Sequence, residues 1–227
     1  MAIAFFVFPF MLLAVVVASC QPQCGLYWVL RSQEGPFEHV QAAMYLGAFA
    51  LSAASTLRAF ASRDRLAAWL FTLFSFGAFF VFAEELSWGQ TLLGFETPEF
   101  LKLHNQQGET TLHNLNWIEA RRLHHWAFML IGLYGSVAWL ARPWVPKQLL
   151  ILLPPWFLSL YFLPAALWYG GGALWATVGI YGSHQETAEL LLATGVMLMT
   201  VVSSASTKVY GQAHRPSSES QKFIQRH

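Results

Sequence analysis

The sequence predicts an all-α fold, a polytopic integral membrane helical bundle. Of the 227 residues, 56% are hydrophobic and only 11% are charged. A soluble domain carries about 25% charged residues, so this chain cannot cover a water-facing surface. Several apolar runs approach the roughly 20 residues that cross a bilayer. We therefore expect a single transmembrane domain over 1–210, with about six transmembrane helices and a short interfacial helix over 98–106, and a disordered cytoplasmic tail over 211–227.

The first apolar run, residues 1–20, carries no charge and predicts an ordinary first span that continues towards Leu30. The run Val17-Ala18-Ser19-Cys20 is similar to a lipoprotein cleavage box. A signal peptide would begin with a positive segment, and this run has none, so the ordinary span is preferred over lipidation. Cys20 and Cys24 are expected to be inert thiols, with a disulfide on an oxidising side as the alternative.

Two further spans follow a break at Gly35-Pro36. Proline suits the first turn of a helix, so Pro36 can open the second span, which we expect over His39–Arg58. A basic loop precedes the third span, expected from Leu66 into Trp88; the loop contains Arg58, Arg63 and Arg65.

The chain becomes polar after Gln90. Thr97-Pro98-Glu99 predicts an N-cap at Thr97, followed by a proline and an acid in the first turn of the short helix over 98–106. Its apolar side chains would face lipid or protein at the interface. Gly108 is expected to end this helix, before an irregular stretch to Asn116.

Three spans are expected after this polar stretch. The fourth covers Arg122–Leu140, and a tight turn over 142–147 connects it to the fifth, Gln148–Trp168. The fifth contains prolines and should be kinked; they are Pro154, Pro155 and Pro164. Three glycines, 170–172, permit a sharp change of direction, and 173–182 would form a short helix or a half-span. The sixth span is expected over Ser183–Thr207.

The charged residues predict the orientation of these spans. Nine of the 13 Lys and Arg residues fall at one set of helix ends, and ten of the 12 acids fall at the other. Basic residues accumulate on the cytoplasmic side of membrane proteins. With six spans, both termini are then cytoplasmic, and the polar segment from Glu84 to Asn114 lies on the extracytoplasmic side.

Glu84 and Glu85 are the first candidates for chemistry. They occur near the end of the third span, about 18 residues into it, where a carboxylate in hydrocarbon is costly and marks a functional site by default. Adjacent helical residues point about 100° apart, so at most one of the two faces the bundle centre. The alternative is a solvated interfacial pair with Trp88 as a membrane-interface anchor.

A second acidic pair lies at the start of the sixth span. Glu186 and Glu189 are three apart and share a helix face. With Glu85 and His113 they could bind a divalent metal ion, and Glu84, Glu85 and Glu189 are the candidate catalytic residues. The alternative is that they are helix N-terminal acids favoured by the helix dipole, which suits Glu186 better than Glu189.

Amides and cations around these acids are candidates for substrate binding. The segment that follows the third span could orient a polar ligand, or could simply bond to buried backbone, through Gln90, Asn105, Gln107, Glu109 and Asn114. An interfacial basic cluster could hold an anionic head group. Its members are Arg121, Arg122 and His124, and plain interface anchoring is the alternative for them.

Several chemistries are disfavoured. The sequence has no His-Glu-x-x-His, Gly-x-Ser-x-Gly, Walker or dinucleotide glycine pattern. The net charge of +1 gives no reason to expect a nucleic-acid partner.

The motifs of the polar segment resemble the signature of an uncharacterised family of bacterial polytopic membrane proteins. They are Glu84-Glu85-x-Ser87-Trp88-Gly89-Gln90, Gly94-Phe95-Glu96-Thr97-Pro98, Asn105-x-Gln107-Gly108-Glu109 and Leu112-His113-Asn114, and the earlier piece Glu34-Gly35-Pro36-x-Glu38 also fits. The resemblance covers most of the chain. It implies that the polar residues form one site and that the chain resides in a bacterial inner membrane. It implies no activity, substrate or cofactor.

The residues together predict an integral membrane enzyme that acts on a lipid or lipid-linked substrate at the outer leaflet. A divalent metal ion is the expected cofactor, with a carboxylate acting as general base as the other possibility. The first alternative is a non-catalytic subunit or assembly factor that binds a membrane protein partner. The second is a small proton-coupled carrier.

Overall fold

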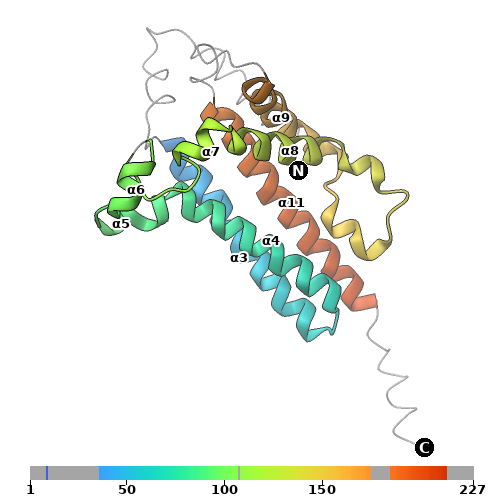
Figure 1. Ribbon diagram of the computed structural model, residues 1–227. Coiled ribbons are helices and arrows are strands. Elements are labelled where there is room, and N and C mark those ends of the chain that lie inside the picture. Colours follow the sequence, from blue (N-terminus) through green and yellow to red (C-terminus); the bar gives the residue numbers. More distant parts are fainter. Residues whose placement is uncertain (1–8, 10–35, 107, 175–184, 214–227) are drawn as a thin grey trace, which may run out of the picture.

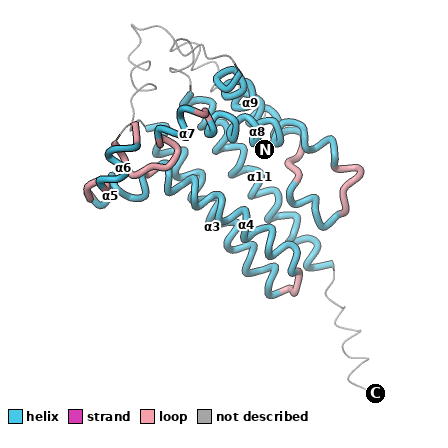
Figure 2. The backbone as a smooth tube through the Cα atoms, viewed as in Figure 1, coloured by secondary structure: helices cyan, strands magenta, loops and turns pink. Residues whose placement is uncertain are grey.

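The apolar runs of the chain form helices, and the computed structural model describes residues 9, 36–106, 108–174 and 185–213 (Figure 1). Four segments of the described chain are long and apolar enough to cross a membrane: Phe37–Ala61, Arg65–Glu85, Lys147–Ala173 and Gln185–Ala205. No strand is present among the described residues, where Figure 2 shows only helices and loops. The all-helical part of the prediction is therefore confirmed.

Helices α3 (Pro36–Ala61) and α4 (Arg65–Glu85) form an antiparallel hairpin and match the predicted second and third spans, since both are long and apolar enough to cross a membrane. Pro36 opens α3, as its position after Gly35 predicts. The loop between the helices is short because the Asp64 side chain caps α4, accepting a hydrogen bond from Ala67 N–H at 3.1 Å. Small buried residues pack together between the two helices near the loop; they are Ala59, Ala67 and Ala68.

Helix α4 ends at Glu85, three residues before the predicted end at Trp88. Ser87 and Trp88 adopt left-handed backbone conformations, with φ of 48° and 56°, and Gly89 follows with φ of 84°. Three such residues in a row cannot continue a right-handed helix. The chain therefore turns sharply through η1 (Ser87–Gly89) into three short helices: α5 (Gln90–Leu93), α6 (Glu99–His104) and α7 (Asn116–Ala120).

The short helix α6 lies within the predicted range 98–106, but its cap differs from the expectation. Pro98 occupies the N-cap position, and no side chain caps the helix. The hydroxyl of Thr97, the predicted cap, instead accepts a hydrogen bond from Gln90 Nε2 at 2.7 Å. That α6 lies at a membrane interface stays a prediction.

Helix α8 (Leu123–Val137) contains only 15 residues, and η2 (Ala138–Ala141) continues it. The predicted fourth span, 122–140, is thus not one continuous α-helix, and it is not among the four candidate spans. The predicted fifth span, 148–168, is not one kinked helix but is interrupted by extended residues. Leu153 and Pro155 are extended and separate η3 (Lys147–Leu152) and η4 (Trp156–Leu158), the latter followed directly by α9 (Ser159–Leu174), which retains Pro164.

The predicted change of direction at 170–172 is wrong, because α9 runs through these glycines to Leu174. They permit close packing on α8 instead. A Cβ added to Gly170 would lie 3.4 Å from Met129, and one added to Gly172 would lie 3.0 Å from the ring of His125. Residues 175–182 of the predicted half-span lie outside the described residues, as do the first span with Cys20 and Cys24, and Glu34.

Helix α11 (Gln185–Ala213) matches the predicted sixth span, is long and apolar enough to cross a membrane, and packs on α3 and α9. Figure 1 shows it beside α3 and α4, with α8 and α9 inclined across its upper part. It runs parallel to α3, because Gln41 bonds to Glu186 near one end and Ser55 bonds to Ser204 at 2.8 Å near the other. The helix continues past 210 to Ala213, so residues 211–213 do not belong to a disordered tail; residues 214–227 lie outside the described residues.

The largest hydrophobic core lies between α9 and α11; its members include Leu158, Tyr161, Phe162, Tyr169, Leu191 and Leu192. The two ends of the bundle differ in charge. Arg58 in the last turn of α3, Arg63 in the loop and Arg65 at the start of α4 lie at one end, whereas Glu38, Glu85 and Glu186 occur at the opposite ends of α3, α4 and α11. The predicted basic loop is therefore shorter than expected and includes the adjoining helix ends. The short helices and loops between α4 and α7, without residue 107, lie at the acidic end (Figure 1).

Candidate functional site

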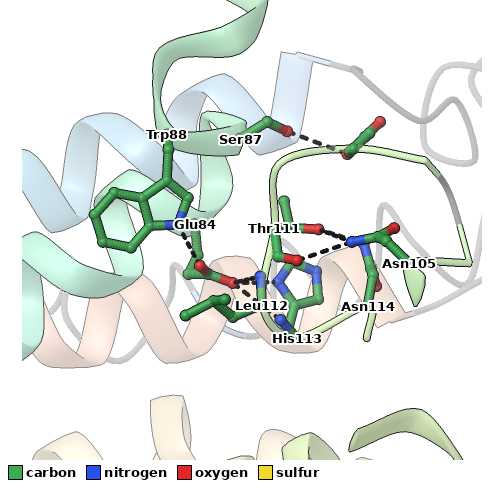
Figure 3. A network of polar contacts seen from close by, with 9 residues as sticks. Glu84, Ser87, Trp88, Asn105, Thr111, Leu112, His113 and Asn114 are labelled. Atoms are coloured by element: carbon green, nitrogen blue, oxygen red, sulfur yellow. Dashed lines mark hydrogen bonds and ion pairs between the residues drawn. The ribbon is translucent and has the colours of Figure 1, made fainter. Parts of the chain in front are cut away.

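Glu84 connects the end of α4 to the polar segment. Its side chain is 7% exposed, and one carboxylate oxygen accepts a hydrogen bond from the indole N–H of Trp88. The other oxygen accepts the backbone N–H groups of Leu112, at 2.9 Å, and His113, at 3.1 Å. The Nδ1 atom of His113 lies 2.9 Å from the same oxygen (Figure 3). A carboxylate is an acceptor only, so these contacts match its ionised form.

The sharp turn after α4 makes these contacts possible. Because Ser87 and Trp88 are left-handed, the chain reverses within one turn and brings the indole of Trp88 back to Glu84. Non-glycine residues in this conformation cost of order 1–3 kcal/mol each and persist only where surrounding contacts hold them. A hydrogen bond from Ser87 Oγ to Glu109 at 3.1 Å is one such contact. The turn therefore positions Glu84 as an anchor for the loop.

The predicted substrate-binding amides lie in the same network and bond within it. Gln90 Oε1 accepts the N–H of Thr110 at 2.9 Å. Asn105 is buried and donates to the carbonyl of Thr111 at 2.8 Å, while Asn114 donates to the Thr111 hydroxyl at 3.2 Å (Figure 3). Gln107 lies outside the described residues. The contacts of these amides favour the alternative in which they support the loop backbone.

A second group of polar residues lies inside the bundle at the same end. We call Glu38, Glu85, Glu186 and Glu189 the acid cluster. The carboxyl group of Glu85 lies within electrostatic range of the other three, most strongly of Glu189. Glu186 is likewise influenced by Glu189 and Glu38. The structure thus brings together three residues that the sequence proposed as one site, Glu85, Glu186 and Glu189.

Neutral polar side chains surround the acid cluster. The buried hydroxyl of Tyr169, on α9, donates a hydrogen bond to Glu189, and Gln185 Nε2 donates to the same oxygen at 3.0 Å. Gln41, on α3, donates to the backbone carbonyl of Glu186 at 3.0 Å and to its carboxylate at 3.2 Å. Tyr45 is buried one turn further along α3, within electrostatic range of Glu85 and Glu189.

The predicted metal ligands are divided between these two groups. Glu85, Glu186 and Glu189 belong to the acid cluster, whereas His113 bonds to Glu84. Across the described ranges, no three His, Cys, Asp or Glu side chains are arranged to hold a metal ion. The geometry of the described residues therefore gives no support to a metal centre of this composition.

The predicted anion-binding cluster of Arg121, Arg122 and His124 contains fewer positive charges than expected. Burial, together with the smaller influence of His125 and His113, lowers the pKa of His124 to about 4. At neutral pH His124 is therefore uncharged and adds no positive charge for an anionic head group. Arg121 is exposed, while Arg122 donates to the carbonyl of Gly172 at 3.0 Å. These two arginines are the cations of this group.

The lowered pKa of His124 predicts a pH-dependent loss of stability. An unfolded histidine binds a proton near pH 6.5, whereas the folded chain resists this down to about pH 4. The free energy of unfolding should therefore decrease as the pH is lowered from about 6.5 to about 4. Above this range the protonation of His124 should not affect stability. His124→Gln should reduce the drop in melting temperature between about pH 7.5 and about pH 5, measured in detergent. His104→Gln, at an exposed position on α6, should not. An equal drop in wild type and His124→Gln would contradict this assignment.

Some residues of the site were missed from the sequence, although their helical spacing is a signal. Gln41 and Tyr45 follow Glu38, an acid of the family-like motif, by three and seven residues, so the three share one face of α3. Gln185 and Glu189 are four apart on α11. Tyr169 has no such signal, because its place beside Glu189 depends on how α9 packs against α11.

Described residues of the family-like signature lie close together at one end of the bundle. Hydrogen bonds there join Glu84 to Trp88 and His113, Ser87 to Glu109, and Asn105 to Thr111. Membership of the family that the motifs resemble stays a prediction. No family model matches the chain, and no curated protein or solved structure matches it.

Proposed function

We propose that this chain is an integral membrane enzyme that uses the acid cluster for acid–base catalysis on a lipid or lipid-linked substrate. The observation that carries the proposal is that four half-buried carboxyl groups from α3, α4 and α11 lie within electrostatic range of one another at one end of the bundle. Acids at the ends of membrane spans are costly and mark functional sites by default.

Electrostatics supports a proton-exchanging role for the cluster. Carboxylates that share an apolar site repel one another strongly, so all four cannot be charged together without a neutralising proton or cation. A pair in which one member is protonated and the other is not supplies both a general acid and a general base. Glu85 and Glu189 are the best candidates for this pair, because the charge of Glu189 is the strongest that acts on Glu85.

The position of the cluster supports a substrate at the membrane surface. Glu38 is the third residue of α3, Glu85 is the last of α4, and Glu189 is the fifth of α11. All lie within about two turns of a helix end. The opposite end carries the basic loop, which the positive-inside rule places in the cytoplasm. The cluster would then face the extracytoplasmic side of a bacterial inner membrane, near Arg121 and Arg122 as partners for an anionic head group.

The packing below the cluster favours an enzyme over a carrier. A Cβ added to Gly195 would lie 3.0 Å from both Phe162 and Tyr161, so α9 and α11 are in close contact there. Leu191 and Leu192 fill the adjacent core. A carrier must open its site to both sides of the membrane in turn, whereas these contacts close the cluster towards the basic end.

A non-catalytic subunit is the second candidate function. The observation in its favour is that Gln90, Asn105 and Asn114 bond within the loop rather than presenting their amides to a ligand. The polar segment would then be a structural network that shapes a surface for a membrane protein partner. In the enzyme proposal the same network positions the loop over the catalytic acids. The six-span topology with both termini cytoplasmic remains part of either proposal.

Replacing the two candidate catalytic acids tests the enzyme proposal. Glu85→Gln and Glu189→Gln should reduce turnover by about 10²–10⁴-fold, because each amide cannot exchange a proton. The measurement compares, by mass spectrometry, lipids and lipid-linked intermediates from membranes that contain each variant at equal abundance. Glu99→Gln, which changes an exposed acid on α6, is the matched control and should behave as wild type.

The outcome distinguishes the two candidates. If wild type, both variants and membranes without the protein give the same lipid profile, the enzyme proposal is rejected. Co-purification of one membrane protein at constant stoichiometry with wild type would then support the subunit.

A further inference from the structure

An open groove lies between α3 and α4, and we call it the α3–α4 groove. It has a volume of about 440 Å³ and is lined by Phe49, Ala53, Thr56, Leu57, Thr72, Ser75, Phe76 and Phe79. This volume is within the range of about 300–1,000 Å³ that is usual for ligand sites. Both helices are candidate membrane spans, so the groove is open to the membrane.

The wall of the α3–α4 groove is apolar. The hydroxyls of Thr72 and Ser75 donate to backbone carbonyls, at 2.8 Å and 3.5 Å. The hydroxyl oxygen of Thr56 is itself buried, so it presents no polar atom to the groove. The side chain of Phe76 is 68% exposed. Such a surface matches a hydrocarbon chain rather than a polar ligand.

Helical spacing continues the groove side of both helices to the basic end of the bundle. On α4, Trp69 precedes Thr72 by three residues, and Arg65 precedes Trp69 by four. On α3, Phe60 follows Thr56 by four residues. The rings of Phe60 and Trp69 meet edge to face, with centroids 6.3 Å apart. Tryptophan accumulates at the level of lipid head groups, so this aromatic pair marks the level at which the groove reaches the membrane surface.

Two arginines lie beyond the aromatic pair. Arg63, in the loop, and Arg65, the first residue of α4, are both exposed. The ion pairs among the described residues include neither of them, and the carboxylate of the neighbouring Asp64 caps α4. Exposed cations at the end of an apolar groove match the chemistry of an anionic phospholipid, in which a hydrocarbon chain leads to a negatively charged head group.

We propose that the α3–α4 groove binds an anionic phospholipid, with an acyl chain between the helices and the phosphate against Arg63 and Arg65. Basic pockets between transmembrane helices bind such head groups. A phospholipid without net charge would fill the groove but would leave the two arginines without a matching charge. The site lies at the opposite end of the bundle from the acid cluster, so it does not depend on the proposed function.

Native mass spectrometry of the detergent-purified full chain tests the charge that the site prefers. Phosphatidylglycerol should bind more tightly than phosphatidylcholine with the same acyl chains. Arg65→Gln should weaken the binding of phosphatidylglycerol about fivefold, because each basic residue near a lipid surface contributes about this factor. Lys102→Gln, which removes an exposed cation of α6, should bind as wild type. Equal affinities for the two lipids, or equal affinities of wild type and Arg65→Gln for phosphatidylglycerol, would overturn the proposal.

The same measurement tests the place of the acyl chain. Ala53→Trp fills the groove and should weaken the binding of phosphatidylglycerol. Ala43→Trp, at an exposed position of α3 that does not line the groove, is the matched control and should bind as wild type. Equal binding by the two tryptophan variants would contradict the assignment of the acyl chain to the groove.

A photoreactive residue in place of Phe76 identifies the occupant directly, and this measurement also decides the case if Ala53→Trp does not fold. In mixed membranes, p-benzoylphenylalanine at this position should form adducts with phosphatidylglycerol in preference to phosphatidylcholine. Adducts with residues 1–30 or with a second copy of the chain would assign the groove to a helix instead, and would overturn the proposal. Neither measurement involves lipid turnover, so the phospholipid site and the enzyme proposal can fail separately.

Discussion

Glu84→Ala is expected to lower the free energy of unfolding by about 3–5 kcal/mol, because it breaks a buried charged contact. The carboxylate of Glu84 accepts the indole N–H of Trp88, two backbone N–H groups and a bond with the His113 ring. Alanine would leave these groups without their acceptor. The backbone N–H groups of Leu112 and His113 should then exchange with deuterium faster in hydrogen-exchange mass spectrometry.

An exposed ion pair provides the control for Glu84. Glu96 lies 3.2 Å from Lys102, but their side chains are 91% and 50% exposed. Such pairs contribute about 0–1 kcal/mol, so Glu96→Ala should barely change unfolding or exchange. If Glu84→Ala were as mild as Glu96→Ala, Glu84 would not be the anchor of the loop.

Gly132→Ala is expected to separate α8 from α9 and to destabilise the bundle by about 1–3 kcal/mol, as overpacking does. A Cβ at this position would lie 2.5 Å from Ala166 N and 2.9 Å from the carbonyl of Phe162. Both atoms belong to the backbone of α9, so no side-chain rotation relieves the clash. The measurement is the melting temperature in detergent, together with the protease sensitivity of 138–158, the connection between the two helices.

Gly77 is a matched control, because it lies inside α4 with no atom within 4 Å of an added Cβ. Alanine favours a helix over glycine by about 0.8–1 kcal/mol, so Gly77→Ala should be neutral or stabilising. Equal melting temperatures for Gly132→Ala and Gly77→Ala would contradict the close contact between α8 and α9.

The apolar runs and the helix-breaking residues of the sequence predicted those parts of the fold that are determined by residues close together in the chain. The second, third and sixth spans appear as α3, α4 and α11, and Pro36 opens α3. The glycines at 170–172 were misjudged, since glycine permits both a turn and a close helix contact. Only the packing of α9 on His125 and Met129 distinguishes the two.

The sequence indicated the acids of the site but not their separate surroundings. Glu84 and Glu85 are adjacent, and the sequence could not tell which of them faces the bundle. In the structure Glu84 points to the loop, whereas Glu85 lies in the acid cluster. His113 was grouped with the wrong acids, because its partner depends on how the loop folds back onto α4. Tyr169 was missed for a similar reason.

A double-mutant cycle between Glu85 and Glu189 tests most directly the claim that these acids share one site. Unfolding in detergent is measured for wild type, Glu85→Gln, Glu189→Gln and the double variant. Either single change removes one carboxyl group of the pair and with it the interaction between the two, so the two effects should not add, with a coupling of about 0.5–3 kcal/mol. The pair Glu85 and Glu99 should be additive. Effects of Glu85→Gln and Glu189→Gln that add to within about 0.5 kcal/mol would contradict the account.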